Sequence, residues 1–215
     1  MKTNLSSQID EDRKNNKHQV DDQRNAILDA AEVLFLQNGL NQTTMVDIAR
    51  KTGIHKVTLY RYFPDRDTIA FEIAVRMLGR IGGAIDTGEH PLKIEIFRNM
   101  ILRMIDQFYA LRDAFRYIGM FDHLYGASYP NEKLAAWYKE QILELGWDIV
   151  LAQKSGFDVS PNQVAMIGNS AMSFLEKMAA RGELMSAEQE VSMDEELSFF
   201  KDMVNAYFDT IVRKI

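Results

Sequence analysis

The sequence has 215 residues, 47% of them apolar and 26% charged, with a formal net charge of −6. This length suffices for one or two domains with a sizeable core. Cysteine is absent, which excludes disulfide bridges and thiol catalysis and is typical of a cytoplasmic protein. No stretch approaches the ~18 uninterrupted apolar residues of a membrane span, and the polar N-terminus does not resemble a signal peptide. We therefore expect a cytoplasmic protein that has no membrane partner.

The first forty residues divide into two parts. Residues 1–20 are rich in charge and poor in apolar side chains, which predicts a disordered N-terminal arm. A helix is expected from about Asp22 to Asn38, ended by Gly39. Its apolar residues fall on one side at helical spacing, and they are Ile27, Ala30, Ala31, Leu34 and Phe35.

The next segment, residues 44–66, has the spacing of a helix-turn-helix. Thr44 is placed to cap a helix, with Asp47 as the acid of a capping box, and Gly53 is placed for a turn. A second helix follows over about 55–62, with Leu59 facing inward. Its outward residues have side chains that can reach phosphates and base edges, and they are His55, Lys56, Thr58, Tyr60 and Arg61.

Positive charge concentrates in this segment although the chain as a whole is acidic. Residues 1–70 contain equal numbers of basic and acidic side chains, so the net negative charge lies in residues 71–215. Between Arg50 and Arg66 there are five basic residues and one acidic residue. A local basic patch can bind phosphate while an acidic body stays off the duplex. The alternative is an ordinary solvated helix face.

A known family shares this pattern of residues. The run T-T-x-x-D-I-A-x-x-x-G-I-x-x-x-T-L-Y-x-Y-F-x-x-R-D, from Thr43 to Asp67, resembles the DNA-binding signature of the TetR family of transcriptional repressors. That family often has glycine where this chain has Val57 and serine where it has His55, which affects the operator sequence and not the fold. The resemblance implies double-stranded DNA as a partner, contacted by Thr44, His55, Lys56, Thr58, Tyr60, Arg61, Tyr62 and Arg66. The N-terminal arm either touches the minor groove or is a solvated tail.

The chain beyond this segment reads as a series of helices. Pro64 breaks the chain, Asp65 caps a fourth helix over about 66–82, and residues 82–91 form a linker. In the family the fourth helix links the DNA-binding head to the body. Further helices are expected from Pro91 to Leu111, over 113–125 and over 132–154. We divide the chain into the arm (1–20), a helix-turn-helix domain (21–66) and a helical domain (67–215).

Aromatic and methionine side chains gather in the first half of the helical domain. Such residues line concave apolar sites that bind small molecules. They are also the ordinary contents of a helical core, and the pattern leaves both readings open. The candidate effector-binding residues are Phe97, Met100, Met104, Phe108, Tyr117, Met120, Phe121, Trp137 and Tyr138.

The last two helices carry apolar residues at alternating steps of three and four. Such seams suit nearly parallel or antiparallel helix packing. By resemblance to the family, two helices from each of two chains form a four-helix dimer interface, and the alternative is that both seams pack inside one chain. The candidate dimerisation residues are Val164, Ile167, Ala171, Phe174, Met178, Phe200, Val204, Tyr207 and Ile211.

Together these features predict an all-α protein with a three-helix head, a linking helix and a larger body. The expected function is a ligand-responsive homodimeric regulator that represses transcription at a palindromic operator and is released by a small apolar or amphipathic effector. The alternative is a DNA-binding structural or chromosome-associated protein without an effector. The four scattered histidines and the lack of hydrolase or nucleotide-binding motifs predict no catalytic residues, no metal and no cofactor, so we do not expect an enzyme.

Overall fold

The computed structural model describes residues 3–85, 94–126, 130–144, 161–181 and 192–212. Every regular element within these ranges is an α-helix, which confirms the predicted fold class. The chain divides into two compact units, which we call the head (Met1–Ile73) and the body (Ala74–Ile215). Among the residues described, no helix is both long and apolar enough to cross a membrane.

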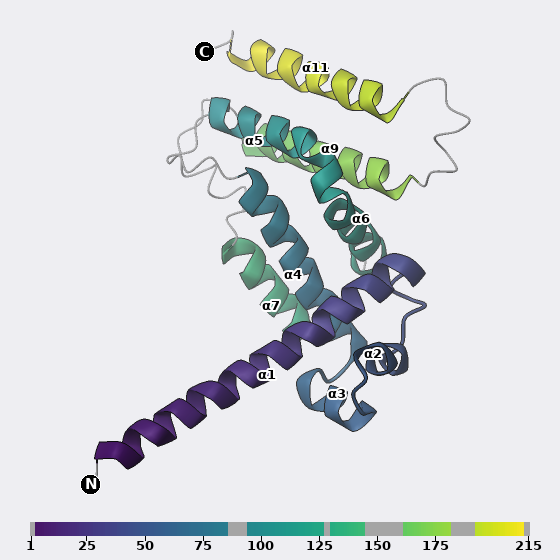
Figure 1. Cartoon of the computed structure of the whole chain (residues 1–215). Coiled ribbons are helices and arrows are strands. Elements are labelled where there is room, and N and C mark those ends of the chain that lie inside the picture. Colours follow the sequence, from purple (N-terminus) through teal and green to yellow (C-terminus); the bar gives the residue numbers. More distant parts are fainter. Residues whose placement is uncertain (1–2, 86–93, 127–129, 145–160, 182–191, 213–215) are drawn as a thin grey trace. The chain divides into compact units, whose positions relative to one another are not determined.

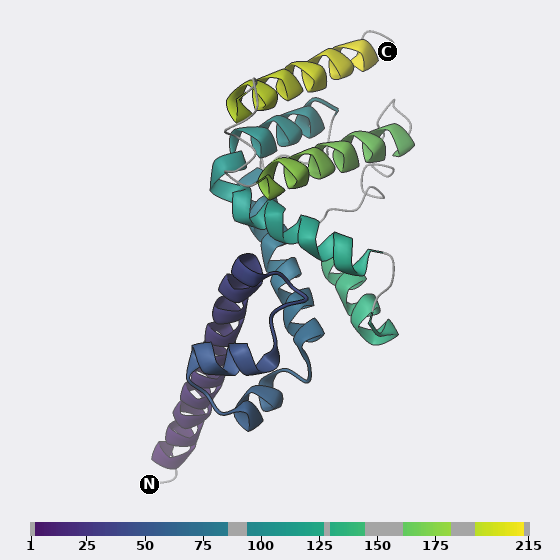
Figure 2. The ribbon, with the colours of Figure 1, turned by 90° about the vertical axis from the view of Figure 1, so that its right-hand side faces the viewer.

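The head consists of α1 (Thr3–Asn38), α2 (Met45–Thr52), α3 (Lys56–Tyr62) and the first two turns of α4 (Arg66–Ile85). Figures 1 and 2 show α2 and α3 on one side of the second half of α1. The apolar stripe of α1 faces them, as its periodicity predicted. The fully covered side chains between these helices include Ile27, Ala31, Phe35, Ile48, Leu59, Phe63, Ile69 and Phe71.

Two boundaries of the head differ from the sequence prediction. Residues 3–20 were expected to be a disordered arm, but α1 is one continuous helix from Thr3. The sequence contains no glycine or proline before Gly39, so nothing in the backbone stops the helix once it has formed. The head also ends at Ile73, inside α4, and not at residue 66.

The side chains of the first part of α4 explain the later boundary. Arg24 of α1 forms an ion pair with Glu72 of α4, and its guanidinium lies over the Phe63 ring, 4.8 Å from the ring centre. Ile69 and Phe71 are completely buried. These residues of α4 therefore belong to the core of the head.

The body contains the rest of α4 together with α5 (Ile94–Asp106), α6 (Phe108–Tyr125), α7 (Glu132–Glu144), α9 (Pro161–Ala180) and α11 (Met193–Val212). A single helix was expected from Pro91 to Leu111, but the chain breaks at Gln107, whose ψ of 8° is not helical. The helix expected over 132–154 is described from Glu132 to Glu144, and the rest of that expectation lies outside the described residues. Within the body, α9 packs on α6, and α11 packs on α5.

The contact between α6 and α9 is close at Gly119. A Cβ atom added there would lie 3.2 Å from Cβ of Glu176, so a larger residue requires the Glu176 side chain to shift by a few tenths of an ångström. Partial burial of Glu176 between these helices raises its pKa to about 7, and the negative charge of Asp122 adds to the rise while Lys177 opposes it. The folded body therefore holds a proton on Glu176 at a pH where the unfolded chain has lost it.

This proton makes the stability of the body depend on pH. Between about pH 4.5 and pH 7 the unfolded chain binds fewer protons than the folded one, so stability falls as pH rises. We expect Glu176→Gln to remove this decline. The free energy of unfolding of the variant, minus that of wild type, should therefore rise up to about pH 7 and then level off. Urea unfolding at several pH values measures this difference. Exposed Glu140→Gln is the matched control, and parallel pH profiles for Glu176→Gln and wild type would contradict the prediction.

Candidate nucleic-acid interface

The first helix of the predicted pair begins with the expected capping box. The Thr44 hydroxyl donates to the Asp47 carboxylate at 2.6 Å, the Thr44 amide donates to it at 3.0 Å, and the Asp47 amide donates back to the Thr44 hydroxyl at 3.3 Å. The hydrogen bonds from Thr44 are the main reason that the pKa of Asp47 lies below its usual value. This cap leaves Thr44 exposed at the N-terminus of α2.

The turn after α2 sets the direction of α3. Gly53 has a φ of 69°, in the left-handed region that glycine occupies without steric cost. Its amide donates to the carbonyl of Arg50 at 3.3 Å, and the Ile54 amide donates to that of Ala49 at 3.2 Å. The chain then enters α3, where Leu59 is completely buried. Burial of Leu59 therefore determines which side of α3 faces the core.

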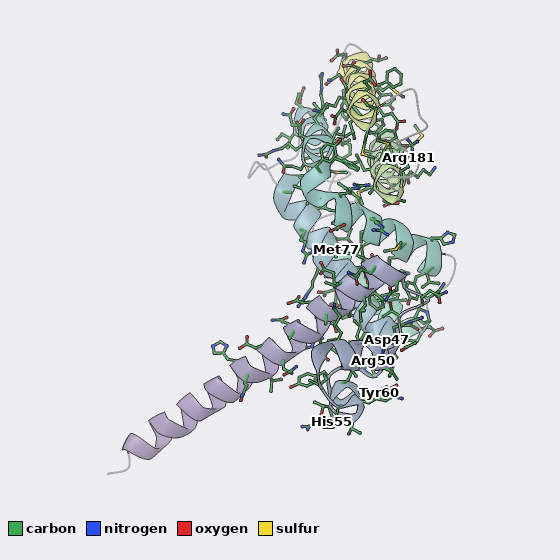
Figure 3. All side chains as sticks on the ribbon, turned by 45° about the vertical axis from the view of Figure 1, so that its right-hand side comes forward. Asp47, Arg50, His55, Tyr60, Met77 and Arg181 are labelled. Atoms are coloured by element: carbon green, nitrogen blue, oxygen red, sulfur yellow. The ribbon has the colours of Figure 1, made fainter. Side chains whose placement is uncertain are left out.

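The outer side of α3 carries the positive charge. Lys56, Tyr60 and Arg61 are exposed, and the Lys56 ammonium lies 5.7 Å from the centre of the Tyr60 ring. In the part of the chain that the structure describes, neither Lys56 nor Arg61 forms an ion pair with an acidic side chain. Figure 3 shows Tyr60 on α3 and His55 just before it, with Asp47 and Arg50 on α2. This surface can offer its cations to an anionic partner without first breaking internal salt bridges.

The other predicted contact residues differ in accessibility. His55 is exposed and immediately precedes α3, whereas Thr58 and Tyr62 are partly buried. Arg66 is engaged within the head, where its guanidinium donates to the Leu40 carbonyl at 3.2 Å and to the Asp67 carboxylate at 2.9 Å. An Arg66 contact with phosphate would therefore have to share the guanidinium with these partners.

One residue of this surface was not among the predicted contacts. Val57 has 76% of its surface exposed, on the same side of α3 as Arg61. The predicted contacts were residues whose side chains can form hydrogen bonds, and the side chain of valine cannot. The signal in the sequence was its position two residues before Leu59, on the opposite side of a helix.

The predicted effector residues fall into separate aromatic contacts. The Phe97 ring lies 6.1 Å from that of Phe208, and the Phe121 ring lies 5.2 Å from that of Tyr138, all between ring centres. Phe108 stacks on a third partner, Phe115. Of the nine candidates, the buried ones are Met104, Phe108, Tyr117, Phe121 and Tyr138, and the partly exposed ones are Phe97, Met100, Met120 and Trp137.

The predicted dimerisation seams turn largely inward. Ala171, Met178 and Val204 are buried within one chain, which favours the alternative that the seams pack inside it. The Phe174 and Phe200 rings stack with their centres 4.0 Å apart. Ile167 and Tyr207 are partly exposed, while the side chains of Val164 and Ile211 lie outside the described residues. The inner face of α9 packs on α6, and the inner face of α11 packs on α5. The periodic spacing of apolar residues cannot show whether such a face packs on its own chain or on a partner chain.

Among the described residues, no three His, Asp or Glu side chains lie where they could hold a metal ion together.

Several known proteins are similar in sequence to part of this chain. The family model "Bacterial regulatory proteins, tetR family" matches residues 27–73. An uncharacterized HTH-type transcriptional regulator of Mycobacterium tuberculosis is 34% identical over 84 residues, covering 37% of this chain and 42% of that protein. The HTH-type transcriptional regulator HbdR of Aromatoleum sp. strain CIB is 38% identical over 52 residues, covering 24% of this chain and 23% of that protein. The chain thus matches less than half the length of either relative.

A solved structure resembles the chain over most of its length. It is a TetR family transcription regulator from Marinobacter aquaeolei VT8, with a TM-score of 0.59, 18% sequence identity, and coverage of 90% of this chain and 97% of that chain. At this identity the likeness concerns the fold alone. The family match lies on the head, over the capping box, the Gly53 turn and the outward face of α3. The head thus matches the tetR family of bacterial regulatory proteins over residues 27–73, and the chain shares the fold of a TetR family regulator over most of its length.

Proposed function

We propose that the protein is a homodimeric transcriptional repressor that binds a palindromic DNA operator through α3 and is released by a small apolar or amphipathic effector. The observation that carries the proposal is the outer face of α3, where Lys56 and Arg61 are exposed and form no ion pair within the described residues. A helix is narrow enough to enter the major groove, where such cations reach phosphates and bases.

The rest of the head supports this docking. The N-terminus of α2 carries the exposed Thr44, which suits a phosphate beside the groove. The negative charge of the chain lies mainly after residue 70, so it does not weaken the attraction of α3 for DNA. Two heads related by a two-fold axis would read two half-sites about one helical turn apart.

A dimer needs an exposed surface, and α11 offers one that is offset from the predicted seam. Phe199 and Met203, one helical turn apart, have 67% and 53% of their surface exposed, and exposed Ala206 continues the same face. Large apolar side chains exposed together on one helix face are typical of an interaction site. The proposed interface therefore uses Phe199 and Met203 in place of Val204.

Disruption of this face should separate the protomers. We expect Phe199→Glu combined with Met203→Glu to convert the dimer to a folded monomer, because an acid at each position would be buried without a partner. Light scattering coupled to size exclusion measures the mass, and circular dichroism reports the fold. Ala136→Glu, on an exposed position of α7, is the control. An unchanged dimer mass in the double variant would exclude this face.

The proposed effector would act through the body. The side chains of Met100, Met120 and Trp137 are partly exposed, which suits contact with an apolar or amphipathic ligand. An effector must favour a conformation of the body that does not bind the operator. A compound that raises the melting temperature and dissociates the DNA complex would meet this requirement. Ligands that bind without releasing DNA would favour a chromosome-associated protein.

The test of the proposed function is selection of bound duplexes from a random DNA pool, with the mass of the complex recorded. A palindromic consensus bound by a dimer is the expected result. Salt-sensitive binding without any consensus would favour a structural DNA-binding role. Absence of binding at low salt would overturn the assignment of α3 as a reading helix.

A further inference from the structure

Val57 is the most exposed of the large apolar side chains described, with 76% of its surface accessible. It contributes little to folding at this position, because an exposed valine buries no apolar area. Its branched Cβ also lowers helix propensity, which matters in a helix as short as α3. Alanine would form this helix at least as well. The presence of valine therefore calls for a reason outside the folded chain.

The position of Val57 on α3 points to that reason. Successive residues of a helix are rotated by about 100°, so Val57 is about 200° from Leu59, the one buried residue of α3. Val57 thus lies within about 20° of the direction opposite the core, and Arg61 lies about 20° to the other side of it. Tyr60 and Lys56 both lie to one side of this direction, about 80° and 120° from it, and Thr58 lies about 80° to the other side. A groove that receives the outer face of α3 meets Val57 and Arg61 first.

The chemistry of the major groove restricts what Val57 can meet there. Most groups on the base edges are hydrogen-bond donors or acceptors, and the one apolar group is the C5 methyl of thymine. An isopropyl group pressed against a guanine or cytosine edge would displace water from polar atoms without replacing its hydrogen bonds. Against a thymine methyl it buries apolar surface on both sides.

We propose that Val57 reads the C5 methyl group of a thymine in each half-site of the operator, while the neighbouring cations hold α3 in the groove. This inference rests on the proposed function, because it requires α3 to enter the major groove. It identifies Val57 as a specificity-determining residue that contributes no hydrogen bond. It also predicts that the recognised feature is a single methyl group.

The test uses the duplex selected from the random pool. Each thymidine is replaced in turn by deoxyuridine, which keeps the base pair and removes only the methyl group. For the wild-type protein, one such position in each half-site should weaken binding by about four-fold, as expected for one buried methyl group. For Val57→Ala the same replacement should have much less effect. Val33→Ala, at an exposed valine on α1, should respond to deoxyuridine as wild type does.

The outcomes separate this inference from the proposed function. Selective binding of a palindrome that is insensitive to deoxyuridine at every position would overturn the role of Val57 and leave the repressor assignment intact. An equal loss for wild type and Val57→Ala would do the same, because another residue would then read the methyl. Failure of the protein to select any sequence would overturn both. Circular dichroism of Val57→Ala checks that its head is folded, as the comparison requires.

Discussion

Replacement of Leu59 by alanine is expected to destabilise the head by about 2–5 kcal/mol, the usual range for a buried leucine. Leu59 is completely buried and is the only residue of α3 that the core covers. Its loss removes the side chain that anchors α3 in the core of the head. A unit of this size has little stability in reserve. We therefore expect much of the head to be unfolded at 37 °C and DNA binding to be lost with it.

Urea unfolding of the full-length protein, followed by circular dichroism, measures the effect. Val57→Ala is the matched control, since it lies two residues away on the same helix and truncates an exposed side chain. Its free energy of unfolding should stay within about 0.5 kcal/mol of wild type. Equal stabilities of the two variants would contradict the placement of α3 on the core.

Removal of both exposed cations of α3 is the second large effect. We expect Lys56→Ala combined with Arg61→Ala to weaken operator binding by about 100-fold or more, since hydrogen bonds to charged groups contribute about 1.5–3 kcal/mol each. If both residues contact phosphates, the slope of log affinity against log salt should become shallower by about 2. Lys56→Ala alone and Tyr60→Phe alone should weaken binding less, with unchanged circular dichroism.

The control for this prediction removes the same charge elsewhere. Lys133 and Lys139 are exposed on α7 in the body, so their replacement by alanine lowers the net charge equally. That variant should bind the operator with nearly wild-type affinity. Equal losses in the two double variants would mean that net charge, and not docking of α3, governs binding. Fluorescence anisotropy of a labelled operator over a range of salt concentrations measures both quantities.

The head was predictable from sequence because its signals are local. A threonine and an aspartate three residues apart make a capping box, and Gly53 adopts the left-handed conformation that the turn requires. Asp65 caps α4 as expected, accepting from the Thr68 amide at 2.7 Å. Each of these interactions joins residues within one turn of chain. Their geometry therefore follows from spacing alone.

Two segments were mispredicted because the apolar pattern carries no signal for what the chain does there. The apolar stripe from Ile94 to Leu111 continues through Gln107 without a change in period, so the break between α5 and α6 left no mark in the pattern. The low apolar content of residues 1–20 indicated an arm, although the continuous helix needs no apolar side chain there.

The candidate functional surfaces also combine features that follow from local sequence with features that depend on tertiary packing. The sequence by itself determined the all-α fold, the capping box, the turn and the identity of the cations on α3, because these depend on contacts within a few residues. Only the tertiary structure decided which side of α11 is covered by α5, which leaves Phe199 and Met203 exposed and Val204 buried. It also decided that Arg66 is held by Leu40 and that Val57 lies opposite the core. A helix can present an apolar stripe to its own chain or to a partner, and packing between residues far apart in sequence selects one of them.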